Sequence, residues 1–117
     1  MEHKLYDLRK IQEIAQGDQV FVRDMLVTFV DNVFDDIEKI RSLTSDWVAV
    51  AGIAHKLASR FAYLSADSLY ALSDDIEKSV LKDNNLTGIA DKTNKLCKES
   101  ILLIEELKRD FDFLCKN

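Results

Sequence analysis

The chain contains no proline and only three glycines among its 117 residues. Proline and glycine most often interrupt helices and form tight turns, so their scarcity favours long helices over strands joined by many turns. Apolar residues also recur at helical spacing. Val22, Leu26, Phe29, Val33 and Ile37 follow one another at intervals of three or four positions. The sequence therefore predicts an all-α protein.

Five helical segments account for most of the chain, and the segments between them are short. Short connections make consecutive long helices pack antiparallel. We therefore expect an antiparallel four-helix bundle with a short additional N-terminal helix, forming a single domain over residues 1–117. The last helix is expected to reach Leu114. The expected helix starts are Asp7, Asp18, Ser45 or Asp46, Ser65–Asp67 and about Thr87.

Charge and hydropathy narrow the range of partners. The net charge is −5, and basic residues do not cluster, which argues against nucleic-acid binding. No apolar run approaches the ~20 residues of a membrane span, so we expect no membrane contact. Cys97 and Cys115 would lie about 27 Å apart on one helix and cannot pair there. We expect a cytoplasmic protein that is monomeric as an isolated domain.

His55 stands among small residues on the third helix. The helical count places it just outside the apolar stripe, where it should be exposed. An exposed imidazole is largely neutral at pH 7, and its free nitrogen lone pair can attack a phosphoryl group. The helical neighbours of His55 are all small: Ala51, Gly52, Ala58, Ser59 and Ala62.

Small neighbours have two explanations that the spacing alone leaves open. Phosphoryl transfer between two proteins requires nearly linear approach of the reacting atoms, so both surfaces must come close around the imidazole. A docking surface for such a partner would contain Val48, Ala51, Gly52, Ala58 and Ala62. Alternatively, His55 is an ordinary surface residue, and the small residues allow a neighbouring helix to approach.

Residues 54–77, AHKLASRFAYLSADSLYALSDDIE, resemble the signature of histidine-containing phosphotransfer (HPt) domains. That signature has a histidine, any residue, Leu or Ile, Lys, Gly, small residues and a leucine-rich helix ending in Leu/Ile-Glu. The upstream stretches LYDLRKIQEIAQGDQVFVRDMLVTFVDN and SDWVAVAGIAHKL are also similar to the family. The resemblance is to HPt domains found at the C-terminus of bacterial hybrid sensor histidine kinases, at the cytoplasmic end of a membrane-anchored kinase.

The resemblance implies a role in two-component signal transduction. His55 would accept a phosphoryl group from an aspartate of a response-regulator receiver domain and pass it to another receiver. The domain would be a carrier without autokinase activity. It would need no cofactor of its own, because Mg²⁺ is expected on the partner receiver domain.

Several positions depart from the family pattern. Ala58 stands where the family usually has a lysine, and Ser59 and Ser65 replace two usual glycines. Lys56 and Arg60 flank the site and either compensate for the missing lysine or remain solvated. Ser59 either donates a hydrogen bond to a phosphoryl oxygen or bonds its own backbone. The missing lysine also leaves an alternative function open, a degenerate bundle that docks a receiver-like partner without carrying phosphate. A purely structural bundle is the third possibility.

The sequence lacks the residues that other kinds of functional site require. His3 and His55 are the only histidines, and the sequence has no cluster with metal-ligand spacing. It also contains no nucleophile elbow and no glycine-rich phosphate loop. We therefore expect no metal site, and no nucleotide site that would support autophosphorylation.

Overall fold

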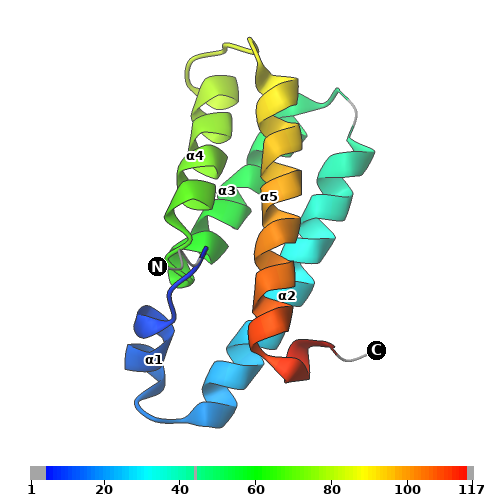
Figure 1. Cartoon of the computed structure of the whole chain (residues 1–117). Coiled ribbons are helices and arrows are strands. Elements are labelled where there is room, and N and C mark those ends of the chain that lie inside the picture. Colours follow the sequence, from blue (N-terminus) through cyan, green and yellow to red (C-terminus); the bar gives the residue numbers. More distant parts are fainter. Residues whose placement is uncertain (1–4, 44, 116–117) are drawn as a thin grey trace.

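The computed structural model describes residues 5–43 and 45–115, and within these the chain is helical, without strands. His3 lies outside the described residues. The fold is an all-α bundle with a short N-terminal helix, which confirms the predicted fold class (Figure 1). The elements are α1 (Arg9–Ala15), α2 (Gln19–Ser42), α3 (Trp47–Tyr63), α4 (Asp67–Leu81), α5 (Ile89–Asp110) and the 3₁₀ turn η1 (Asp112–Cys115).

The four long helices run alternately up and down along the bundle (Figure 1). The bundle measures 44 × 29 × 28 Å, and α2 alone, at about 36 Å, spans most of its length. Helix α1 lies beside the first turns of α2, at the end opposite the loop between α4 and α5. Two hydrogen bonds tie this end to α3: Asp7 N–H donates to Leu64 O at 2.7 Å, and Lys10 Nζ donates to Ala62 O at 3.1 Å.

Two of the expected N-caps are confirmed, and one is wrong. Asp18 accepts a hydrogen bond from Phe21 N–H, and the Asp46 side chain does the same for Ala49 N–H, both at 3.1 Å. Helix α1, however, begins at Arg9 rather than after Asp7. The Asp7 carboxylate instead accepts from Arg9 N–H at 2.9 Å and pairs with the Arg9 guanidinium at 2.7 Å.

The last helix ends earlier than predicted. Helix α5 stops at Asp110, because Phe111 adopts an extended backbone with φ of −133°. The chain then turns back through η1, where Leu114 is still buried and Phe113 lies under the Arg23 guanidinium of α2 at 4.8 Å. The apolar residues expected to extend the helix therefore reach the core through a turn.

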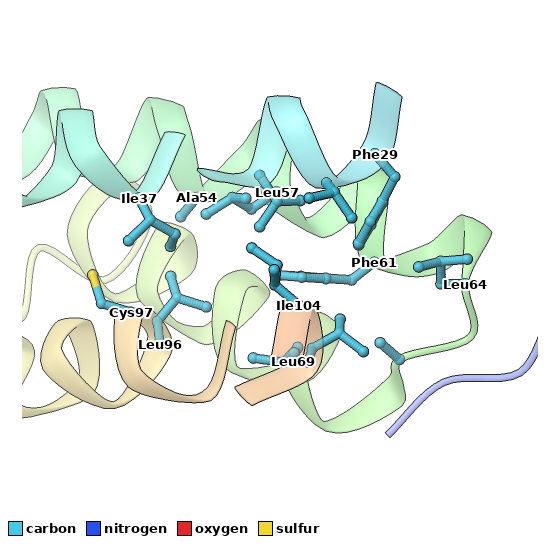
Figure 2. Close-up of a cluster of buried hydrophobic side chains, with 14 of the residues drawn as sticks. Phe29, Ile37, Ala54, Leu57, Phe61, Leu64, Leu69, Leu96, Cys97 and Ile104 are labelled. Carbon is cyan, nitrogen blue, oxygen red and sulfur yellow. The ribbon is translucent and has the colours of Figure 1, made fainter. Parts of the chain in front are cut away.

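The core is one continuous cluster that all four long helices share (Figure 2). Phe61 of α3 is fully buried and meets Phe29 of α2 edge to face, with ring centroids 6.2 Å apart. Leu57 lies one turn earlier on α3, and Leu96 and Ile104 enter from α5. This core fixes which face of α3 points inward and, by elimination, which face meets solvent.

One departure from the family pattern, Ser65, lies in the turn between α3 and α4. Ser65 has φ of 51°, in the left-handed region that favours glycine. A glycine at this place, as the family usually has, would adopt this conformation without crowding a Cβ atom. The serine adopts this conformation at a small cost in backbone strain.

Candidate functional site

His55 projects from the middle of α3, and its side chain is 67% exposed. Its Nδ1 atom lies 2.9 Å from Oε2 and 3.1 Å from Oε1 of Glu77, which belongs to α4. A carboxylate can only accept hydrogen bonds, so the contact requires a proton on Nδ1. When the imidazole is neutral, Nε2 then carries the free lone pair. The site therefore presents one defined nitrogen for chemistry.

Sequence reasoning did not identify Glu77 as a partner of His55. The two residues are 22 positions apart on separate helices, so their contact depends on how α3 and α4 pack. The only sequence signal was the Ile76-Glu77 pair at the end of the stretch that resembles the family signature. That pattern does not indicate which side chain Glu77 contacts.

A groove of about 350 Å³ borders His55 on the side of α2. It is formed by α2 and α3, with one residue from α1 at its end. Its lining combines apolar side chains with the polar residues around the histidine. The apolar residues of the groove are not among the site residues predicted from the sequence. The apolar lining is Ile11, Met25, Phe29 and Tyr63, and the polar lining is Thr28, Asn32, His55, Lys56, Ser59 and Arg60.

The three residues expected to flank the site all line this groove beside His55. Their environments differ. Arg60 donates from Nε to Oδ2 of Asp36 at 3.1 Å, and Asp36 on α2 is buried with only 4% of its surface exposed. Lys56 is exposed and, among the residues that the structure describes, has no acidic partner. Ser59 is also exposed.

The predicted docking surface is wrong for two of its five residues. Val48 and Gly52 are exposed and Ala62 is half-buried, but Ala51 and Ala58 are buried. On the helix, these two alanines lie between the core stripe and His55, on the side where Glu77 of α4 approaches. Their small side chains let α4 pack against α3, the closest helix pair in the bundle. At these positions the neighbouring-helix explanation holds.

Gly52 differs from these alanines because nothing in the described protein fills the space beside it. A Cβ atom built on Gly52 has no neighbour within 4 Å. A glycine inside a helix lowers stability relative to alanine by roughly 0.5–1 kcal/mol. Packing against another helix therefore does not account for a glycine here.

Gly52→Ala is accordingly expected to raise the free energy of unfolding by about 0.5–1 kcal/mol, because the added methyl group meets no neighbour and alanine favours the helix. Urea denaturation followed by circular dichroism measures this change. A loss of stability in this variant would show that an unrecognised contact needs the glycine.

Two further findings concern metals and membranes. Within residues 5–43 and 45–115, no three His, Cys, Asp or Glu side chains gather closely enough to hold a metal ion. No helix in the same ranges is both long and apolar enough to span a bilayer.

Comparison with protein-family models matches the Hpt domain over residues 24–110, which is most of the chain and includes both His55 and Glu77. Searches of curated proteins and of solved structures found no match. The matched region contains the four long helices apart from the first turn of α2. The chain therefore belongs to the Hpt domain family, whose members carry phosphoryl groups in two-component signalling.

Proposed function

We propose that this chain is a phosphorelay intermediate in which Nε2 of His55 accepts a phosphoryl group from a receiver-domain aspartate and passes it to another receiver. The observation that carries the proposal is an exposed imidazole whose Nδ1 atom is held by Glu77 at 2.9 Å. This contact occupies Nδ1 and leaves Nε2 as the available nitrogen. A receiver partner also implies a cytoplasmic location, whether the domain is free-standing or part of a hybrid kinase.

The chemical step follows from this geometry. The Nε2 lone pair attacks phosphorus as the bond from phosphorus to the aspartate oxygen breaks, and that electron pair leaves on the aspartate carboxylate. The imidazole ring becomes more positive as the new bond forms. Glu77 stabilises this charge and keeps the proton on Nδ1. Return of the phosphoryl group to a receiver reverses the same bonds.

The surface around His55 suits a second protein. The groove that His55 borders is also lined by the apolar side chains of Met25, Phe29 and Tyr63. Gly52, three positions before His55 on α3, leaves open space, which permits close approach. We propose that a receiver domain occupies the groove and places its aspartate in line with Nε2. Magnesium is expected at the acidic site of the receiver.

The direct test is incubation with a phosphorylated receiver domain followed by intact mass measurement of this chain. We expect the wild type to gain one phosphoryl group and His55→Gln to gain none while keeping its helical circular dichroism. Phosphorylation of His55→Gln would contradict the assignment. A complex with the receiver without any transfer would support the degenerate binding module instead.

Glu77→Ala is expected to slow transfer from the receiver by about tenfold, because a hydrogen bond to a charged group contributes roughly 1.5 kcal/mol or more. Glu77→Gln keeps an acceptor for Nδ1–H but loses the charge, so its transfer rate should lie between those of the wild type and Glu77→Ala. Both rates can be followed by intact mass at saturating receiver. Equal rates for wild type and Glu77→Ala would show that Glu77 does not position the imidazole.

A further inference from the structure

Phosphorylation of His55 would create an excess of negative charge at this site. A phosphoryl group carries about −1.5 to −2 charges near neutral pH. The Glu77 carboxylate already lies 2.9 Å from the other ring nitrogen. Two anionic groups attached to, or touching, one imidazole repel each other, so a nearby cation would favour the phosphorylated state.

The other basic residues near His55 already have partners within the protein. Position 58, where the family usually has a lysine, is a buried alanine. Arg60 lines the groove, but its guanidinium pairs with the buried Asp36. Lys10 of α1 donates its ammonium group to Ala62 O at 3.1 Å, at the end of α3. Lys56 is left as the exposed groove cation without an acidic partner in the part of the chain that the structure describes.

The helix geometry gives Lys56 a route to the phosphoryl group. Adjacent residues on a helix diverge by about 100°, so His55 and Lys56 do not touch through their first carbons. Ser59 lies one turn later, four positions after His55 and three after Lys56, and it lines the same groove. Helical side chains lean toward the N-terminus, so Ser59 borders the gap between the two. Its small side chain leaves that gap open for the flexible lysine stem.

We propose that Lys56, together with the hydroxyl of Ser59, forms the binding site for the phosphoryl oxygens of phospho-His55 and replaces the lysine that the family usually has at position 58. The inference rests on the proposed function, because it concerns the phosphorylated state of His55. It assigns Arg60 a separate structural role in pairing with Asp36.

The test uses ³¹P NMR of the chain after phosphorylation by a receiver and removal of that receiver. A cation beside the phosphoryl group stabilises its dianion and so lowers the pH at which the dianion takes up a proton. In Lys56→Gln, the midpoint of the ³¹P titration should rise by about half a pH unit. At equilibrium with the receiver, the ratio of phosphorylated to unphosphorylated chain should fall about two- to fivefold.

Two matched variants sharpen the comparison. Lys56→Arg keeps the charge and should titrate close to the wild type. Lys98→Gln removes an equal charge from an exposed position on α5, outside the groove, and should leave the midpoint unchanged. The inference is overturned if Lys56→Gln titrates like the wild type or if Lys98→Gln shifts the midpoint equally. If the wild-type chain gains no phosphoryl group, the proposed function fails, and the inference about Lys56 fails with it. If the wild type is phosphorylated but Lys56→Gln titrates like it, only the inference about Lys56 fails.

Discussion

Arg60→Ala is expected to lower the free energy of unfolding by about 3 kcal/mol and Tm by roughly 10 °C. The variant removes the partner of Asp36, whose side chain is only 6% exposed, and leaves a carboxylate buried between α2 and α3 without its cation. Breaking such a pair from one side is costly, because the remaining charge has lost both water and its partner. Thermal denaturation followed by circular dichroism measures the change.

The double variant Asp36→Leu/Arg60→Leu provides the control. Replacing both members of a buried ion pair by apolar residues of similar size is often neutral, so this variant should be close to the wild type in stability. A wild-type Tm in Arg60→Ala would contradict the structural role of the pair. Slower phosphoryl transfer with unchanged stability would instead indicate that Arg60 contributes to binding the phosphoryl group.

Ser59→Leu is expected to slow phosphoryl transfer by as much as 10²-fold while stability changes by no more than about 0.5 kcal/mol. Ser59 is exposed and borders the groove one turn after His55, so a leucine there meets solvent in the free protein. The larger side chain would hold a docked receiver away from Nε2. Displacement by about 1 Å is enough to spoil the in-line geometry.

Ser59→Ala keeps the position small and loses only the hydroxyl that is proposed to contact the phosphoryl group, so it should transfer much faster than Ser59→Leu. If an unrecognised helix contact explained the small residue, Ser59→Leu would instead lose about 1–3 kcal/mol through overpacking. A lowered Tm with transfer intact would therefore contradict the idea that this surface is kept open for a partner.

Local signals in the sequence predicted most of the fold. The apolar repeats located the long helices, and an aspartate marked the start of both α2 and α3. The end of α5 could not be predicted in this way. Phe111 leaves the helix and Phe113 packs under Arg23 of α2, and that contact depends on tertiary structure. The helical periodicity of apolar residues continues through the same residues and does not indicate the turn.

The candidate site was predictable only where one helix determines it. The position of His55 outside the apolar stripe gave its exposure correctly. Ala51 and Ala58 lie at the edge of that stripe, where burial depends on how closely α4 approaches. The contact with Glu77 and the ion pair between Arg60 and Asp36 each join two helices. Both contacts depend on how two helices are placed relative to each other. The periodicity of apolar residues within a single helix does not determine that placement.

In the proposed function, His55 is phosphorylated on Nε2 because Glu77 holds Nδ1. The most direct measurement is a long-range ¹H–¹⁵N correlation spectrum of the ¹⁵N-labelled chain after phosphorylation by a receiver domain. In that spectrum, coupling to phosphorus identifies the modified nitrogen. We expect coupling at Nε2 of His55, with the proton retained on Nδ1. A phosphoryl group on Nδ1, or on any residue other than His55, would contradict this assignment.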